Sequence, residues 1–341
     1  MRRGAWWTML VVAVVAAACT GSPEGPRGAP TTSPTTPERA STTPPTKAPP
    51  SPSSSMPPPT TTTLPPAPDS PRSLRWAWSN PGAGGAFSEA AIVGDVLAVA
   101  SDLAGVIVST DGGATWQTRG SFAGLGETHA SAVAIDPDDP ETILAGTEGG
   151  LYRSDDAGGT FGRLEPTGFV DAAAVRGERI VAAVRSAYDR PDAVVWASSD
   201  GGETWQQHPL PGNRTVVAIE LDPSDPDRAL VLTGSGRFAE GPAGIFLLED
   251  GALEAVDADL GEIVDAAFDR HHPATIWATS DDPDPDAPGH LWRLDEGDWS
   301  RVADHGGVLW LPPEPGVIRL TDPRHQFPWD DRSGVWQSTD G

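Results

Sequence analysis

The sequence predicts an all-β fold: a β-propeller of about six four-stranded blades, preceded by a signal peptide and a disordered tether. Three observations predict it. A short aspartate-centred motif recurs about every 45 residues, stretches of alternating apolar residues lie between its copies, and Asp-Pro turns run in phase with it. Four antiparallel strands in each unit of that length, repeated about six times, are typical of a propeller.

Residues 1–18 are predicted to be a secretory signal peptide. Arg2 and Arg3 precede an apolar run from Ala5 to Ala18, which matches the charged and apolar regions of such a signal. A helix of that length reaches ~21 Å at ~1.5 Å per residue, short of a hydrocarbon layer of ~30 Å. The run therefore indicates export and is too short for a membrane span.

Cys19, the only cysteine in the chain, directly follows the signal. The run Ala16-Ala17-Ala18-Cys19 resembles the box of bacterial lipoproteins, although Ala16 stands where Leu is usual. The resemblance implies that Cys19 carries a lipid and anchors an extracytoplasmic protein to the bacterial cell membrane. An ordinary secretory signal with an unmodified cysteine is the alternative. A single cysteine also excludes a disulfide framework and a multi-cysteine metal site.

Residues 19–72 are predicted to form the tether. They are mostly Thr, Pro, Ser and Ala after the cysteine, a composition with too little apolar surface to offset the entropy of ordering. About 50 residues in an extended conformation at ~3.1 Å each would span ~150 Å. The propeller is expected over residues 73–341, held away from the membrane.

The charge of the propeller region excludes nucleic acid as a partner. The full chain has 23 basic and 48 acidic side chains. Six basic and three acidic ones lie in residues 1–72, so residues 73–341 carry 17 basic and 45 acidic side chains, a net charge of −28. Such a surface repels phosphates and anionic lipid headgroups, so contact with the membrane is expected through the Cys19 lipid alone.

Three full copies of the motif S-x-D-x-G-x-T-W/F define the repeat. Its fixed positions are Ser109, Asp111, Gly113, Thr115 and Trp116 in the first copy, Ser154, Asp156, Gly158, Thr160 and Phe161 in the second, and Ser198, Asp200, Gly202, Thr204 and Trp205 in the third. Weaker copies centre on Asp250 and Asp295, and a sixth begins at Ser338.

The motif residues suit a tight corner between two strands. Asp111 can accept backbone N–H groups of the turn, Gly113 permits an unusual backbone angle, and Trp116 can pack between blades. The pattern resembles the Asp box of the bacterial neuraminidase repeat family, which includes sialidases, xyloglucanase-like hydrolases, sortilin-type receptors and photosystem II assembly factors. The resemblance implies that the boxes are structural and lie away from the functional face.

Each unit is expected to run strand A, turn, strand B, loop, strand C, Asp box, strand D. Alternating apolar stretches flank the turns at Asp136-Pro137, Asp222-Pro223 and Asp269, as strands do. Two accounts of closure remain open. Residues 74–78 supply the last strand D, or the chain is truncated inside its sixth box and a seventh blade is absent.

The loops between strands B and C are longer in units three to six, which predicts that they form the binding face. Candidate residues are the aromatic and cationic ones on these loops: Arg185, Tyr188, Arg190, Arg237, Phe238, His290, Arg324, His325, Phe327 and Trp329. The alternative is that these side chains fold back onto blade edges. The acidic run 281–286 is interpreted as a solvated loop and His271-His272 as a turn, so neither a metal site nor a cofactor is predicted.

The residues favour a binding protein over an enzyme. No Arg-Ile-Pro signature occurs, and the chain has only two tyrosines. Tyr152 is expected in the core, in strand C directly before an Asp box, and Tyr188 lies too early for a sialidase nucleophile. A single propeller also lacks the two-propeller cleft of xyloglucanase-type hydrolases. The chain is more similar to the assembly-factor propellers, which implies a non-enzymatic platform with no catalytic residues that binds a protein or glycan on the B–C loop face. A degenerate glycoside hydrolase or a carbohydrate-binding propeller is the alternative.

Overall fold

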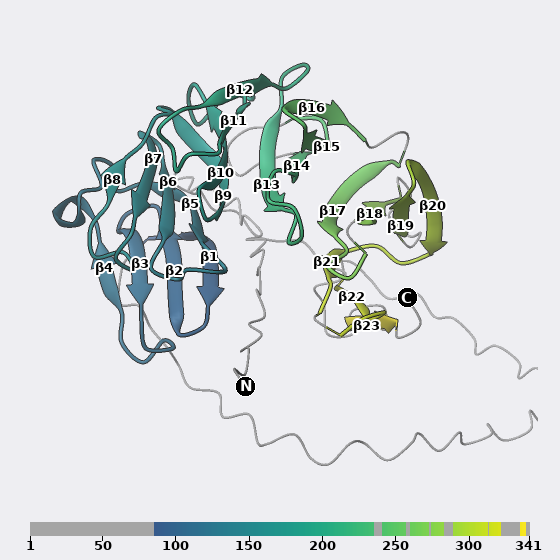
Figure 1. Ribbon diagram of the computed structural model, residues 1–341, viewed down its shortest axis with the longest axis horizontal. Helices are drawn as coiled ribbons and strands as arrows, with labels where there is room; N and C mark the ends of the chain where they lie inside the picture. Colours follow the sequence, from purple (N-terminus) through teal and green to yellow (C-terminus); the bar gives the residue numbers. More distant parts are fainter. Residues whose placement is uncertain are drawn as a thin grey trace, which may run out of the picture. The chain divides into compact units, whose positions relative to one another are not determined.

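The chain folds into six antiparallel sheets in a computed structural model that describes residues 85–234, 241–256, 260–272, 274–282, 289–312, 314–321 and 335–338. Within these residues, five sheets have four strands and the sixth has three (Figure 1). The strands of every sheet follow one another in chain order. Each sheet is therefore a simple antiparallel meander.

The strands of the first three sheets match the predicted A–B–C–D order. The first sheet contains β1 (Phe87–Val93), β2 (Val96–Ser101), β3 (Gly105–Ser109) and β4 (Gln117–Arg119). The second contains β5 (Ala130–Ile135), β6 (Ile143–Thr147), β7 (Gly150–Ser154) and β8 (Gly162–Arg163). The third contains β9 (Phe169–Arg176), β10 (Arg179–Arg185), β11 (Val194–Ser198) and β12 (Gln206–Pro209). A short 3-10 turn, η1 (Ser121–Ala123), lies between the first two sheets.

The last three sheets continue the series. The fourth contains β13 (Thr215–Leu221), β14 (Ala229–Gly234), β15 (Gly244–Glu249) and β16 (Ala252–Ala255). The fifth contains β17 (Glu262–Phe268), β18 (Ile276–Asp281), β19 (His290–Asp295) and β20 (Asp298–Ala303). The sixth contains β21 (Val308–Trp310), β22 (Ile318–Thr321) and β23 (Val335–Ser338).

Each sheet packs against the next one along the chain. The first strands mediate most of this packing: β1 contacts β5, β5 contacts β9, β9 contacts β13, and β17 contacts both β14 and β21. Figure 1 shows the same succession in its colours, from the blue first sheet to the yellow sixth. Four-stranded meanders packed face to face in sequence form a β-propeller, so the predicted fold class is confirmed.

The hydrophobic core is divided into layers between consecutive sheets. One cluster joins Val108 of the first sheet to Tyr152 of the second, and another joins Leu144 of the second to Ile180 of the third. Because both faces of a middle sheet are covered, its second strand can be buried along its whole length. In β6 and β14 every residue is buried. This explains why alternation is weaker there than in a half-exposed strand.

The Asp-Pro clusters form the turns between the first and second strands of their sheets. The Asp136 carboxylate accepts the N–H of Asp138 at 2.8 Å. The carboxylate of Asp222 accepts the N–H of Ser224 at the same distance. His271 lies in the equivalent turn of the fifth sheet and donates its N–H to Asp269 at 2.8 Å. His271-His272 therefore belongs to a turn, as the repeat register predicted.

The three full Asp boxes form wide corners between the third and fourth strands. In the second box, Asp156 accepts the Ser154 hydroxyl at 2.8 Å, the Thr160 N–H at 2.7 Å and the Thr160 hydroxyl at 2.9 Å. Ser154 also accepts the N–H of Gly158, whose φ is 78°. Such an angle favours glycine. The first and third boxes have the same hydrogen bonds.

The two weaker copies of the motif are tight hairpins with a different geometry. Strands β15 and β16 are separated only by Asp250 and Gly251, which have φ of 52° and 74°. Glu296 and Gly297 join β19 to β20 with φ of 51° and 91°. Positive φ at both turn residues is typical of a two-residue hairpin. These corners lack the serine and threonine of the full boxes, so the weaker copies share the spacing of the motif without its hydrogen bonds.

Several predictions concern residues outside those described. The signal peptide, Cys19, the tether, the closing segment 74–78 and the end of the sixth box all lie there. The N-terminal boundary of the propeller at residue 73 therefore stays a prediction. Among the described residues, no helix has the length and apolar character needed to cross a membrane.

Candidate functional site

The structure describes four of the ten candidate binding residues. Arg185, Tyr188, Arg190 and His290 can be placed. The other six lie outside the described residues: Arg237, Phe238, Arg324, His325, Phe327 and Trp329. The loop between β10 and β11, residues 186–193, is consequently the long B–C loop that can be analysed in full.

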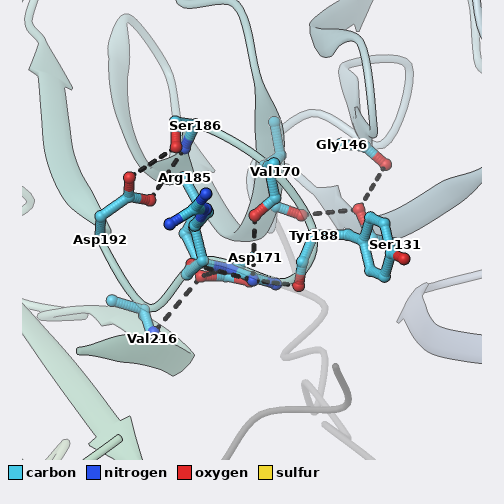
Figure 2. A network of polar contacts seen from close by, with 11 residues as sticks. Ser131, Gly146, Val170, Asp171, Arg185, Ser186, Tyr188, Asp192 and Val216 are labelled. Atoms are coloured by element: carbon cyan, nitrogen blue, oxygen red, sulfur yellow. Dashed lines mark hydrogen bonds and ion pairs between the residues drawn. The ribbon is translucent and has the colours of Figure 1, made fainter. Parts of the chain in front are cut away.

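Arg185 ends β10 and is buried beneath this loop (Figure 2). Only 2% of the residue is exposed. Its Nε lies 2.7 Å and 2.8 Å from the two carboxylate oxygens of Asp171 on β9. Its guanidinium carbon also lies 4.6 Å from the centre of the Phe169 ring. The sequence suggested that Arg185 presents its charge to a partner. In the structure this charge is buried, and the side chain supports the loop from beneath.

The same guanidinium holds the loop backbone. Its Nη1 donates to the carbonyl oxygens of Ala187, Tyr188 and Arg190. Ser186 and Asp192 close the base of the loop, since the Ser186 N–H donates to the Asp192 carboxylate at 3.0 Å and its hydroxyl donates to the same group. A loop fixed by so many bonds loses little conformational entropy when it binds a partner.

The outer side of the loop carries the exposed groups. Tyr188 is 53% exposed, and Asp189 and Arg190 are exposed as well. An aromatic ring and an arginine on a preordered loop are the residue types that anchor protein interfaces. The loop therefore has a buried polar base and an accessible aromatic tip.

Burial governs the ionisation of the ion pair beneath the loop. It raises the pKa of Asp171 to about 6, and the neighbouring Arg185 guanidinium opposes that shift. The carboxylate is therefore ionised at neutral pH and gains a proton in mildly acidic solution. Protonation would weaken the anchor that holds the loop backbone.

The first strand of each sheet is called its inner strand here. Asp171 is one of several polar side chains that join consecutive inner strands. Glu89 on β1 accepts the N–H of Val133 on β5 at 2.9 Å. Asp265 on β17 accepts the N–H of Leu309 on β21, also at 2.9 Å. These contacts lie near β-bulges, where a displaced residue redirects its neighbours' side chains. The bulges thus aim polar groups at the next sheet.

Ser131 and Val216 belong to the same series of contacts between inner strands (Figure 2). The Ser131 hydroxyl on β5 donates to the carbonyl of Val170 on β9 at 2.6 Å. The Val216 N–H on β13 donates to Asp171 at 3.4 Å. Each inner strand from β1 to β9 therefore bonds through a side chain to the following one.

The inner-strand carboxyls have raised pKa values because they are removed from water. Burial raises the pKa of Glu89 to about 7 and that of Asp265 to about 6. It raises the pKa of Glu220 on β13 to about 8, with a further increase from Asp265 and an opposing effect of Arg270. The backbone N–H of Phe268 on the next sheet also opposes the increase in the pKa of Glu220. These groups can hold protons near neutral pH, while their hydrogen bonds join the sheets.

His290, the remaining candidate, begins β19 and is largely buried. Its side chain is 14% exposed, and its Nε2 lies 3.3 Å from a carboxylate oxygen of Asp282. The imidazole meets the Trp292 ring edge-on at 6.0 Å. His290 therefore folds onto its own sheet, in agreement with the alternative considered for these side chains. The described residues contain no group of three potential metal ligands.

A groove of about 460 Å³ lies on the Asp-box side, between the second and third sheets. The sequence did not predict a cavity there. Its lining is charged and polar: Arg153, Asp155, Asp156, Thr160, Gly162, Arg163, Leu164, Glu178, Asp200, Gly201 and Glu203. The carboxylates of Asp156 and Asp200 already accept bonds within their boxes. The volume falls in the range of small-ligand pockets.

Sequence reasoning also missed exposed apolar side chains on the first sheet and the connection that follows it. Phe87, Leu103 and Phe122 are 43%, 71% and 107% exposed. The search for a binding face followed loop length, and the first sheet has a short B–C loop, residues 102–104. A large apolar residue in a glycine-rich turn, such as Phe122 between Gly120 and Gly124, was the available signal.

The fold defines the chain as a β-propeller, and similar solved structures include GH74 enzymes and YCF48. An ancestral GH74 enzyme shares 21% identity and a TM-score of 0.55, over 76% of this chain and 39% of that one. The GH74 xyloglucanase from Xanthomonas campestris shares 16% and a TM-score of 0.51, over 72% and 42%. YCF48 bound to a D1 peptide shares 14% and a TM-score of 0.50, over 72% and 76%.

These similarities show the fold alone, because all the identities are low. The chain spans less than half the length of the two GH74 proteins. No family model and no curated protein matches the sequence. The propeller fold accommodates hydrolases as well as binding proteins.

Proposed function

We propose that the protein is an exported lipoprotein, anchored through Cys19, whose propeller is a non-enzymatic platform that binds a partner protein. The observation that carries the proposal is the loop 186–193. Arg185 fixes its backbone from beneath, while Tyr188 stays 53% exposed at its tip. A rigid loop that presents an aromatic side chain binds at low entropic cost.

The use of the buried carboxyls supports binding over catalysis. Asp171, Glu89 and Asp265 have raised pKa values, as catalytic acids often do. Each of them nevertheless accepts a backbone N–H from the following sheet. A structural role, hydrogen bonding between sheets, is therefore sufficient to explain why these carboxyl groups are present, and no catalytic role is needed.

The test is site-specific photo-crosslinking of the full chain in its host cells. A photoreactive amino acid is placed at Tyr188 and, as the control, at Glu141, which is exposed in a turn on the Asp-box side. We expect one defined protein adduct from position 188 and none from position 141. Equal adducts from both positions, or no adduct from position 188, would contradict the proposal, and turnover of fluorogenic glycosides would contradict its non-enzymatic part.

The anchor is tested separately. Cys19→Ser should abolish metabolic labelling with palmitate, because the predicted lipid attaches at that sulfur. The control is a serine substitution at the neighbouring Thr20, which should leave the labelling unchanged. Labelling that persists in Cys19→Ser would contradict the lipoprotein assignment while leaving the platform proposal standing.

A carbohydrate ligand is the second candidate function. The groove of about 460 Å³ between the second and third Asp boxes favours it, since its guanidinium and carboxylate groups could hydrogen-bond sugar hydroxyls. A glycan array probed with the full chain tests this candidate. Saturable binding that Glu178→Gln and Glu203→Gln weaken would support it, and turnover of the bound glycan would make the protein an enzyme.

A further inference from the structure

The exposed apolar side chains of the first sheet lie on segments that meet at one corner. Residues 85–87 run beside the loop 102–104: the Asp102 N–H donates to the Ala86 carbonyl at 3.1 Å, and the Asp102 carboxylate accepts the Ala86 N–H at 2.7 Å. The connection 120–129 joins the same corner, since the Gly105 N–H donates to the Thr128 carbonyl at 2.8 Å.

The backbone around Gly105 is closely packed at this corner. A Cβ at Gly105 would lie 2.5 Å from the Arg119 carbonyl oxygen and 3.3 Å from the Gly120 Cα. Its φ of 76° also disfavours other residues. Backbone contacts thus hold the three segments together, and each segment carries one exposed apolar side chain: Phe87, Leu103 or Phe122.

Phe122 in particular is presented by a fixed turn. Its neighbours Ala123 and Leu125 are 7% and 1% exposed and belong to the core between the first two sheets. The Phe161 N–H of the second sheet donates to the Ala123 carbonyl at 2.6 Å. Because both flanks of Phe122 are anchored, its ring cannot turn inward without breaking these contacts. A fully exposed Phe held in this way gains free energy when a partner buries it.

Charge decides between the possible occupants of this surface. Residues 73–341 carry a net charge of −28, so a second copy of the chain and an anionic lipid surface are both repelled. Asp102 and Glu127 lie on the segments of this corner, and Glu148 of the second sheet lies beside them, since its N–H donates to the His129 carbonyl at 3.1 Å. A partner that offers apolar side chains flanked by Lys or Arg is attracted electrostatically and also buries the exposed rings.

We propose that the corner formed by residues 85–87, 102–104 and 120–129 is a docking surface for a basic, apolar segment of a partner protein. The inference rests on the proposed function as a partner-binding platform and adds a second contact surface, separate from loop 186–193. Phe122 and Leu103 supply the apolar anchors, and the acidic surroundings select partners of opposite charge.

The first test is binding of two labelled synthetic peptides with identical Leu and Phe residues, one flanked by lysines and one by glutamates. The full chain should bind the lysine peptide, and raising the salt from ~50 mM to ~300 mM should weaken the complex. The double variant Leu103→Ser/Phe122→Ser should raise Kd at least ~10-fold. Val302→Ser, which changes a 46% exposed residue of the fifth sheet, is the matched control.

Several results would overturn the inference. Equal binding of both peptides would show that the surface does not select by charge. An unchanged Kd in the double variant would show that the peptide does not bind at this corner. Self-association seen by sedimentation and abolished in the double variant would identify a second copy as the occupant. Flotation with vesicles of phosphatidylglycerol that the double variant abolishes would identify a lipid surface.

Photo-crosslinking from position 122 in cells separates this inference from the proposed function. We expect an adduct whose cross-linked segment, sequenced by mass spectrometry, contains apolar residues and a net positive charge. An adduct from position 188 without one from position 122 would leave the platform standing and overturn the docking corner. Adducts from neither position would contradict both.

Discussion

Carboxylates accept backbone N–H groups both in the Asp-box corners and on the inner strands, but their pKa values are shifted in opposite directions. At the exposed corner, the Thr115 hydroxyl and N–H lower the pKa of Asp111 to about 2. On the inner strand β17, Asp265 also accepts backbone N–H groups, yet burial raises its pKa to about 6. Hydrogen bonds have the larger effect on the pKa of the exposed Asp111 and burial has the larger effect on that of Asp265, so solvent access decides which of the two effects prevails.

The two regions also differ in the length of chain that they join. Asp111 bonds to groups within four residues, which closes a single corner. Glu89 and Asp265 each bond to a strand 44 residues further along, which joins one sheet to the next. Damage to a corner should therefore stay local, whereas damage to an inner-strand carboxyl should reduce the stability of the whole propeller.

The largest effect is expected from Asp171→Asn. The substitution leaves the Arg185 guanidinium buried without its counter-charge, since the two side chains are only 1% and 4% exposed. Loss of one partner of a buried ion pair costs about 3 kcal/mol. Denaturant unfolding should show this loss in the free energy of unfolding.

The control is the double variant Asp171→Leu/Arg185→Met, which removes both charges and keeps the volume. It should recover much of the stability, because an apolar pair avoids the desolvation of two charges. Limited proteolysis should still show faster cleavage of loop 186–193 in the double variant, since the loop loses its guanidinium anchor. A cost below about 1 kcal/mol for Asp171→Asn alone would mean that the pair contributes little.

A backbone change at a corner should rank second. Gly158 of the second Asp box has a φ of 78°, and an added Cβ would lie 2.9 Å from Val108 Cγ2 on the first sheet. The left-handed conformation costs about 1–2 kcal/mol for alanine, and the contact with Val108 adds to it. Gly158→Ala should therefore cost about 2 kcal/mol in denaturant unfolding.

Gly177 provides the matched control for that backbone change. Its φ is 57°, but an added Cβ meets nothing within 4 Å. Gly177→Ala should therefore show the conformational cost alone, about 1 kcal/mol. If the two variants are equally destabilised, the corner does not depend on close packing against the neighbouring sheet.

The third effect depends on pH. Glu89 has a pKa of about 7 in the folded chain and an ordinary value near ~4.3 when unfolded. Between these values the folded state binds more protons, so this group makes stability fall as the pH rises. Glu89→Gln keeps an acceptor for the Val133 N–H but carries no charge. The substitution should change the free energy of unfolding little at pH ~4 and should increase it at pH ~8.

Unfolding curves at several pH values check this sign. The slope of the unfolding free energy against pH should be less negative in Glu89→Gln between pH ~4 and ~7. A substitution at an exposed corner, Asp200→Asn, is the control, because that carboxyl has a pKa of about 2 and titrates below this window. An identical pH slope in Glu89→Gln and the unmodified chain would show that Glu89 is not protonated in the folded state.

Prediction from sequence succeeded where the determining residues lie close together in the chain. The Asp156 carboxylate in the corner at Ser154–Phe161 bonds to groups within four residues, and Asp136 accepts the N–H of Asp138 in its own turn, so the local motif reveals these bonds. The weaker copies at Asp250 and Asp295 were identified by their spacing, and the structure forms a tight two-residue hairpin at each. Their missing serine and threonine already distinguished them from full boxes.

The candidate site was harder to predict because its partners are distant in sequence. Arg185 was assigned to a binding face from its residue type and its place beside a loop. Its burial depends on Asp171 and Phe169 on another strand, which no local pattern displays. The exposed Phe122 was missed for the converse reason: its exposure follows from the anchoring of Ala123 and Leu125 in the core.

The smallest effect is expected from Thr115→Val at the first corner. The valine removes the hydroxyl that donates to Asp111 at 2.6 Å but keeps the backbone donor and the side-chain shape. Because this hydroxyl is the largest contributor to the lowered pKa, the pKa of Asp111 should rise from about 2 toward its ordinary value. Carboxyl-detected NMR titration measures the change.

Other carboxyls of the same molecule are the internal controls for this titration. Asp200 in the third box should keep its pKa of about 2, and Glu89 should keep its pKa of about 7, since neither contacts Thr115. A parallel change at Glu89 would show that the corners and the inner strands are coupled through the first sheet. In that case the Asp-box carboxylates could no longer be regarded as local contacts that act independently of the carboxyls joining the inner strands.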